Sequence, residues 1–219
     1  MIEQASVSVF GERLPLARRY AEILASIGVE RGLLGPREVT RIWERHLLNC
    51  AVLQELIDPA EHVVDVGSGA GLPGIPLAIA RPDLRVTLVE PLLRRATFLD
   101  EVVAALELDV VVHRGRAEDA ATRRAVGPAD VVASRAVAPL GKLMAWCLPH
   151  ARPGGRVLAL KGKTAAEELA RDFDAIRRAG GRSATARECG VGLLDTPSTV
   201  VEVVRAPRSE HGRWCRARA

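Results

Sequence analysis

The fold is decided by residues 63–74, which read Val63-Val64-Asp65-Val66-Gly67-Ser68-Gly69-Ala70-Gly71-Leu72-Pro73-Gly74. The short valine-rich run predicts a buried strand, and glycines at alternate positions follow the acid near its end. Glycine permits a sharp turn, and its backbone can approach a ligand closely because it has no Cβ. The stretch therefore predicts a strand, a ligand-binding loop and the start of a helix.

Strand and helix patterns alternate from this point to about residue 179. Candidate strands lie at residues 62–66, 85–90, 110–113, 130–134 and 156–160, and helical patterns lie at 75–80, 92–108, 120–125, 140–148 and 165–179. Two further runs, 183–188 and 198–204, have no helix between them and predict a hairpin. The pattern indicates an α/β fold with a doubly wound, Rossmann-like parallel sheet.

The first sixty residues have a helical pattern instead. Leu16, Tyr20 and Leu24 recur on one face of a 3.6-residue period, and Pro36 suits the first turn of a second helix that ends before Asp58-Pro59. We therefore expect a helical cap over residues 1–60, the α/β domain over 61–205 and a basic tail over 206–219.

Composition restricts the class of protein. The chain has 219 residues, 48% of them hydrophobic and 26% charged, which suits one main globular domain. Its longest stretch without a charged residue, 66–80, is too short to span a membrane, and the N-terminus lacks a basic signal region. We expect a monomeric cytoplasmic protein that does not bind membranes.

Cysteine spacing and charge add little to this assignment. Cys50, Cys147, Cys189 and Cys215 are far apart and form no CxxC pair, so we expect free thiols and no metal site. The net charge is +4, and residues 205–219 alone hold five arginines against one glutamate. A basic tail is weak evidence for nucleic acid on its own.

Two ligand classes compete for the glycine loop. Gly69, Gly71 and Gly74 fit the dinucleotide fingerprint, but that register begins two residues after Gly67, the first glycine. Asp65 would oppose a pyrophosphate, whereas it would attract the amino group of S-adenosylmethionine, whose carboxylate could use the helix N-terminus. The acid therefore favours S-adenosylmethionine as the cofactor.

Acids also follow the next two strands. Glu90 lies 23 residues after Gly67, close to the spacing of an acid that binds ribose hydroxyls. After the third strand, Glu118 or Asp119 could accept a hydrogen bond from an adenine amino group, with Ala117 packed beside the ring. A nucleoside-binding edge of the sheet is the simplest explanation for acids after three successive strands.

At this point the sequence resembles a known family. The segment from Asp65 to Pro76, with its GLPGIP extension, together with Ser134-Arg135-Ala136 and Leu160-Lys161-Gly162, resembles the RsmG family, also called glucose-inhibited division protein B. These ribosomal RNA small subunit methyltransferases use S-adenosylmethionine. The resemblance implies methylation of N7 of a guanine in the 530 loop of 16S ribosomal RNA, free or in the small subunit. It also implies cofactor contacts by Gly67, Leu72, Ala117, Glu118 and Arg135.

Methylation of guanine N7 would need little catalytic machinery, since N7 carries a lone pair and no proton to remove. Arg135 is the candidate catalytic residue, because its guanidinium could reach the cofactor or guanine O6. The alternative for Arg135 is a structural ion pair with Glu118 or Asp119. Cys147 lies in an apolar helical run, where a packed thiol is more expected than a nucleophile.

Several basic residues are candidates for RNA contact. They are Arg45, His46, Lys161 and Lys163, with Arg94-Arg95 and Arg123-Arg124 as further candidates whose spacing equally suits solvated helix faces. Other functions stay open at this stage. They are a small-molecule O-methyltransferase, a nicotinamide dehydrogenase and an RNA-binding assembly factor without activity.

Overall fold

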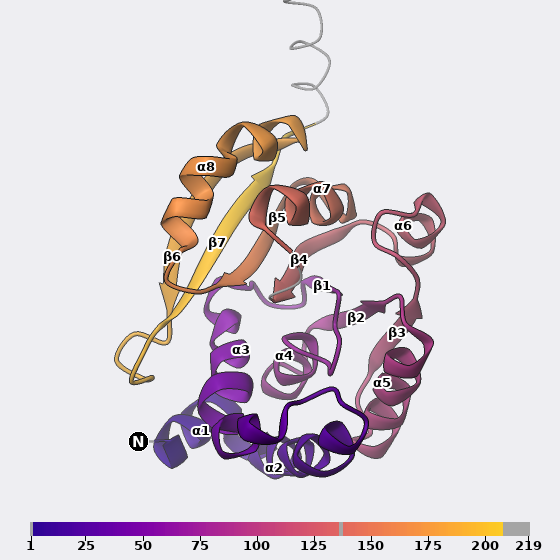
Figure 1. Ribbon diagram of the computed structural model, residues 1–219, viewed down its shortest axis with the longest axis vertical. Coiled ribbons are helices and arrows are strands. Elements are labelled where there is room, and N and C mark those ends of the chain that lie inside the picture. The colour runs from indigo at the N-terminus through magenta and orange to yellow at the C-terminus, as the bar shows by residue number, and fades with distance from the viewer. Residues whose placement is uncertain (1, 136–137, 208–219) are drawn as a thin grey trace, which may run out of the picture.

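The computed structural model describes residues 2–135 and 138–207. The basic tail from residue 208 onward, including Cys215, and Ala136 of the Ser134-Arg135-Ala136 motif lie outside the described residues. Within them, seven strands form one sheet in the order β3-β2-β1-β4-β5-β7-β6 (Figure 1). The strands are β1 (His62–Val66), β2 (Arg85–Glu90), β3 (Val110–Arg114), β4 (Ala129–Arg135), β5 (Ala151–Lys161), β6 (Gly181–Cys189) and β7 (Ser198–Arg205).

The first five strands are parallel, and β6 and β7 pair antiparallel as the predicted hairpin. Four helices connect these parallel strands: α4 (Gly74–Ala80), α5 (Leu93–Ala105), α6 (Ala120–Val126) and α7 (Leu140–Cys147). A fifth helix, α8 (Ala165–Arg178), leads from β5 to β6. The predicted doubly wound α/β fold is confirmed, because strand order reverses between β1 and β4. Carboxyl ends of the parallel strands therefore meet at one edge, where such folds bind ligands.

Alternation along β1 separates two hydrophobic clusters. Val63 packs with α4, α5 and the N-terminal segment, while Val64 and Val66 pack with α7 and α8 on the opposite face. Successive side chains of a strand point to opposite faces, so Asp65 shares the α4 face with Val63. The position of Asp65 along β1 therefore directs its side chain toward α4.

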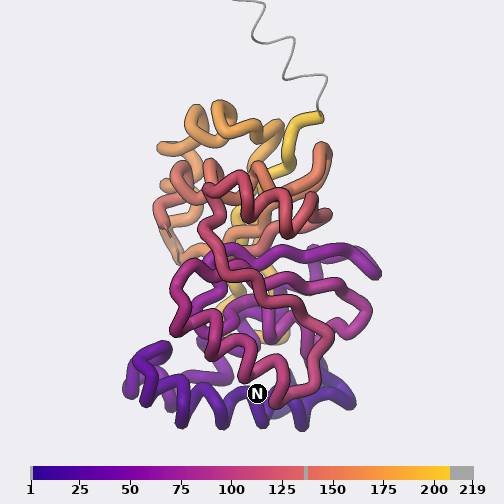
Figure 2. The backbone as a smooth tube through the Cα atoms, turned by 90° about the vertical axis from the view of Figure 1, so that its right-hand side faces the viewer, coloured from indigo at the N-terminus to yellow at the C-terminus, as the bar shows by residue number. Residues whose placement is uncertain are grey.

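The N-terminal cap consists of α1 (Ile2–Phe10), α2 (Leu14–Ile23) and a run of short helical segments from Pro36 to Leu56 that includes α3 (Asn49–Ala51). Helices α1 and α2 of the cap lie at the opposite end of the molecule from α8 (Figures 1 and 2). Residues 49–55 of the cap instead contact the β6–β7 hairpin: Asn49 Nδ2 donates to Ser198 Oγ at 2.8 Å, and the Gly190 amide donates to Glu55 Oε1 at 3.0 Å. The cap shares one hydrophobic cluster with β1, α4 and α5. The cap and the α/β part therefore share core, and the division at residue 60 stays a prediction.

The second cap helix is less regular than its pattern predicts. Residues Pro36–Arg41 form 3₁₀ turns and Ile42–Leu48 form π turns before the short α3. Three consecutive residues, His46, Leu47 and Leu48, are buried, which a single helical face does not allow. The widened turn presents all three to the protein interior, and such insertions are frequent at functional sites.

Gly71→Ala tests whether the loop depends on close packing. Gly71 has φ +100°, and a Cβ there would lie 2.5 Å from Ile75 Cγ1 and 3.0 Å from the Tyr20 hydroxyl. We expect the free energy of unfolding, measured in urea, to fall by about 2–4 kcal/mol through backbone strain and overpacking. Gly162→Ala is the control, because its Cβ would meet no described atom within 4 Å. Equal stability of the two variants would contradict this account.

Candidate functional site

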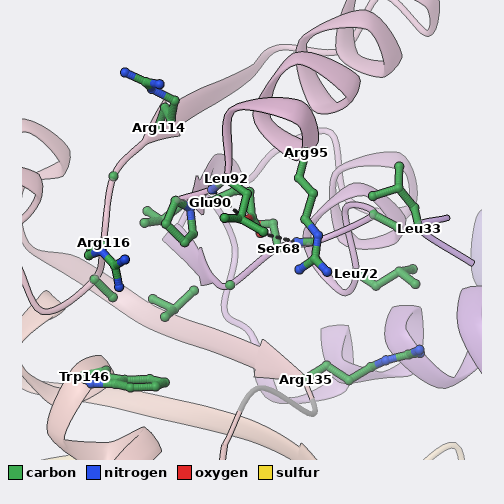
Figure 3. Close-up of a pocket in the computed structure, with 18 of the residues that line it drawn as sticks. Leu33, Ser68, Leu72, Glu90, Leu92, Arg95, Arg114, Arg116, Arg135 and Trp146 are labelled. Carbon is green, nitrogen blue, oxygen red and sulfur yellow. Dashed lines mark hydrogen bonds between the residues drawn. The ribbon is translucent and has the colours of Figure 1, made fainter. Parts of the chain in front are cut away.

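A cavity of about 1130 Å³ opens at the carboxyl ends of β1–β4, between the α/β part and the cap. It is lined by the cap residues Leu33, Leu34, Gly35, Glu38 and His46, by Val66–Ala70 and Leu72, by Val89–Leu92 and Arg95, by Arg114–Asp119, and by Arg135, Lys142 and Trp146 (Figure 3). Sites for nucleoside cofactors are usually cavities of this size at this position.

The glycine loop is fixed from two sides. Gly67 and Gly69 have φ of +75° and +58°, conformations that favour glycine. The amides of Gly67 and Ser68 donate to the Val89 carbonyl of β2, at 2.9 and 3.2 Å. From the cap, the fully buried Tyr20 donates its hydroxyl to the Ala70 carbonyl at 2.7 Å. The backbone facing the cavity is thus set before any ligand binds.

Asp65 does not line the cavity. Its carboxylate is fully buried, and Oδ2 accepts the Gly74 amide of α4 at 3.0 Å. The expectation that Asp65 faces a positive group of the ligand is therefore not met, because its parity along β1 turns it toward α4. The first amide of α4 is also engaged, so the expectation that this helix N-terminus binds the cofactor carboxylate is not met either.

Gly71 is likewise absent from the cavity lining and packs against Tyr20, Ile75 and Leu99. Of the other predicted cofactor residues, Gly67, Gly69, Leu72, Glu90, Ala117, Glu118 and Arg135 all line the cavity. These seven predicted residues therefore lie together around one cavity. Cofactor contacts by these residues stay a prediction.

Glu90 ends β2 beside the glycine loop. Its Oε2 accepts the Gly69 amide at 2.9 Å, and its Oε1 accepts the Leu92 amide at 3.0 Å. Each carboxylate oxygen has two lone pairs, so each keeps one for a ligand hydroxyl. The carboxylate is thereby held rigidly at the position expected for binding ribose.

The segment after β3 forms the next wall of the cavity. Ala117 is buried, and its carbonyl accepts a hydrogen bond from His150 Nε2 at 2.9 Å. Glu118 is half-exposed, and its closest cation is Arg116 at 3.7 Å. A small apolar side chain beside an accessible carboxylate suits an adenine ring and its amino group.

Arg135 joins the sheet to the cap, and the alternative ion pair with Glu118 or Asp119 is not formed. Instead, Nη1 donates to the Arg45 carbonyl at 3.1 Å and to Cys50 Sγ at 3.3 Å. Nη2 lies 2.5 Å from His46 Nδ1. Figure 3 shows the side chain extending from the end of β4 toward the cap. Its other donors, Nε–H and one Nη2–H, have no partner among the described residues and are free to bind a ligand.

His46 connects Arg135 to Glu38. Its Nε2 lies 2.9 Å from Glu38 Oε2, so the neutral ring donates to Glu38 and accepts from Arg135. Burial lowers the pKa of His46, and the Arg135 and Arg45 guanidiniums lower it further against the opposing effect of Glu38. The neutral ring that Arg135 requires is therefore favoured.

The predicted RNA-binding residues are scattered. His46 lines the cavity, but Arg45 lies outside it and pairs with Glu38 at 3.0 Å. Lys161 is mostly buried, and its ammonium pairs with Glu168 and donates to the Ala138 carbonyl, each at 2.9 Å. Lys161 is thus a structural cation and not a free phosphate ligand. Lys163 is exposed and away from the cavity.

Three residues that the sequence did not single out support the site: Tyr20, Glu38 and Trp146. The partner of Tyr20 is 50 residues away, and no local motif marks any of the three residues. Across residues 2–135 and 138–207, no cluster of three histidine, cysteine or acidic side chains could hold a metal ion. No helix in the same ranges is long and apolar enough to cross a bilayer.

The fold is the Rossmann-like fold of class I S-adenosylmethionine-dependent methyltransferases. A putative enzyme of this class from Methanococcus maripaludis shares the fold, with a TM-score of 0.58 and 13% identity over 88% of this chain and 93% of that one. Aeropyrum pernix fibrillarin, solved with natively bound S-adenosyl-L-methionine, matches with a TM-score of 0.53 and 19% identity over 73% of this chain and 75% of that one.

The particular family follows from sequence. The chain belongs to the family described as rRNA small subunit methyltransferase G, whose sequence model matches residues 13–192. Proteins named ribosomal RNA small subunit methyltransferase G are 61% identical in Rhodococcus jostii, over 96% of this chain and 93% of that one, and 57% identical in Mycolicibacterium gilvum, over 94% and 91%. The resemblance, the cofactor and the ribosomal RNA substrate class are thereby confirmed.

Asp65→Asn tests the buried carboxyl through the pH dependence of stability. Burial raises the pKa of Asp65 to about 7, so the folded protein binds a proton that the unfolded chain releases near pH 4. The stability that protonated Asp65 contributes to the folded protein is fully present below pH 4 and is lost as the pH rises through 7. Between pH 5 and 8, we expect the free energy of unfolding of the wild type to fall relative to that of Asp65→Asn by about 1–3 kcal/mol. A difference that does not change with pH would contradict this.

His46 variants test how Arg135 is held. Glutamine can accept from Arg135 and donate to Glu38, whereas alanine can do neither. We expect His46→Gln to keep methyl transfer within about threefold of the wild type and His46→Ala to lose roughly 10–100-fold, as expected for a lost charged hydrogen bond. Protonated His46 would point an N–H at Arg135, so wild-type activity should fall only below about pH 6.5.

The measurement is the pH profile of methyl transfer to small-subunit ribosomal RNA. Glutamine does not titrate, so His46→Gln should lose this fall in activity at acid pH. If wild type and His46→Gln lose activity equally as the pH is lowered, His46 does not control Arg135.

Proposed function

We propose that the enzyme transfers a methyl group to N7 of a guanine in the 530 loop of 16S ribosomal RNA. We further propose that it acts as a monomer in the cytoplasm, where this substrate resides. The atom and the loop come from the family resemblance, and the chemistry of the cavity supports them.

The observation that carries the proposal is Arg135 at the end of β4. Its guanidinium is held by His46 and by the Arg45 carbonyl, yet it keeps unused donors beside the cavity. A guanidinium donates well to guanine O6, the acceptor next to N7 on the same edge of the base. Donation to O6 leaves the N7 lone pair free to react.

The basic group closest to Arg135 is not available to remove a proton. His46 lies between Glu38 and Arg135, and Glu90 accepts two backbone amides. Guanine N7 has no proton to lose, so a reaction centre whose histidine is engaged on both sides suits it better than a hydroxyl substrate. This favours the proposal over a small-molecule O-methyltransferase.

Cysteine chemistry is also disfavoured. Cys50 contacts Arg135, but burial raises its pKa to about 11, and Cys147 is fully buried in the cluster under α7. A nucleophilic cysteine needs a lowered pKa and access to the substrate. The described cysteines therefore do not fit the covalent mechanism of cytosine-C5 methylation.

The cofactor fits the residues present. S-adenosylmethionine supplies an electrophilic methyl group on its sulfonium. Glu90, Ala117 and Glu118 would hold the nucleoside, and the Gly67–Gly69 backbone leaves room beside it because no Cβ fills the cradle. The protein then contributes by holding N7 in line with the methyl group, and orientation alone can supply several kcal/mol of rate enhancement.

The proposal is tested by mapping methylated guanines at nucleotide resolution in 16S ribosomal RNA. Cells lacking this protein should lose one N7-methylguanine, in the 530 loop, and the wild-type gene should restore it. Arg135→Ala should restore less than about 1% of the methylation while still unfolding cooperatively, since it removes both orientation and a charged contact. A methyl group on another atom or in another loop would refute the proposed specificity.

A further inference from the structure

Arg95, the third residue of α5, lines the cavity but has no partner there. Its Nε is buried without a hydrogen bond, and no ion pair to Arg95 forms within residues 2–135 and 138–207. Figure 3 shows the side chain descending from α5 to lie beside Ser68 and Leu72. A buried donor without a partner costs roughly 1–3 kcal/mol, more when it is charged, which points to a ligand that supplies the acceptor.

We propose that Arg95 binds the carboxylate of the amino-acid tail of S-adenosylmethionine. The inference rests on the proposed placement of the nucleoside, with ribose at Glu90 and adenine at Ala117 and Glu118. In Figure 3, Arg116 lies on one side of Glu90, and Arg95 and Leu72 lie on the other. A cofactor with its adenine near Arg116 therefore extends its tail along the glycine loop toward Arg95.

Other donors are either engaged or placed for another ligand. The Gly74 amide, the first of α4, donates to Asp65, and the free donors of Arg135 lie at the end of β4, where the proposed guanine binds. Lys142 lies over the Trp146 ring at 5.1 Å, away from the Leu72 end. Arg95 thus offers the unengaged guanidinium at this end of the cavity, and its planar fork matches a carboxylate.

The local charges favour the same orientation. The Glu90 carboxylate accepts the Gly69 amide of the loop, so it repels a carboxylate and attracts the ammonium of the tail. A zwitterionic tail would then direct its ammonium to the loop and its carboxylate outward to α5. This arrangement gives an acceptor to the buried Nε of Arg95.

Calorimetry with two ligands isolates the tail. S-adenosylhomocysteine carries the amino-acid tail, whereas 5′-methylthioadenosine lacks it and keeps the nucleoside and sulfur. We expect Arg95→Gln to weaken S-adenosylhomocysteine binding by about 10–100-fold, as for a lost charged hydrogen bond, and to leave 5′-methylthioadenosine binding within about twofold. Arg94→Gln is the matched control, because Arg94 is the exposed neighbour outside the cavity, and it should change neither affinity.

The result that overturns the proposal is equal affinity of Arg95→Gln and wild type for S-adenosylhomocysteine, or an equal loss for both ligands. Weaker binding only to an RNA fragment with the 530 loop would assign Arg95 to a phosphate and also overturn it. Thermal unfolding of each variant, without ligand, shows whether it is folded.

A further variant separates this inference from the nucleoside placement. Glu90→Gln should weaken both ligands alike if the ribose lies at Glu90. If Glu90→Gln leaves 5′-methylthioadenosine binding unchanged, the nucleoside placement is wrong. The difference between the two ligands for Arg95→Gln still decides the role of Arg95.

Discussion

The site depends on one buried hydrogen bond, from the Gly74 amide to the Asp65 carboxylate. It fastens the last part of β1 to the first residue of α4, across a loop whose glycines have no side chains to pack. The cost is a buried carboxyl whose pKa rises to about 7 and whose Oδ1 has no partner. A buried polar group of this kind persists when it specifies a geometry that the protein needs.

The cap completes the site from the other direction. Tyr20 donates a hydrogen bond to the Ala70 carbonyl. His46, which is bonded to Glu38, holds Arg135, the last residue of β4. Neither the sheet nor the cap alone forms the cavity. The shared hydrophobic cluster of cap, β1, α4 and α5 provides the rigid support that such precise placement requires.

Much of this could be predicted from sequence. The predicted bounds of β1 and β2 match the structure to the residue, since Gly67 and Pro91 directly follow the two valine-containing runs and leave few alternatives. The side of the sheet on which Asp65 lies could also be predicted, because Asp65 is two residues from the buried Val63 and so points to the same face. The adjacent glycine motif instead suggested that Asp65 faces the ligand. Contacts such as His46 with Arg135, 89 residues apart, leave no local pattern to find. The ion pair of Lys161 is closer in sequence, since Glu168 is seven residues away, but it forms only because the turn between β5 and α8 brings the two side chains together.

The hydrogen bond from Tyr20 to the Ala70 carbonyl also links ligand binding at the glycine loop to docking of the cap. Any molecule that binds the glycine loop and prefers its present shape must also favour the docked cap, and the linkage is reciprocal. A cofactor bound at the loop would therefore stabilise the docked cap, and displacement of the cap would weaken cofactor binding. One phenolic hydroxyl can in this way couple the position of the cap to the filling of the cavity.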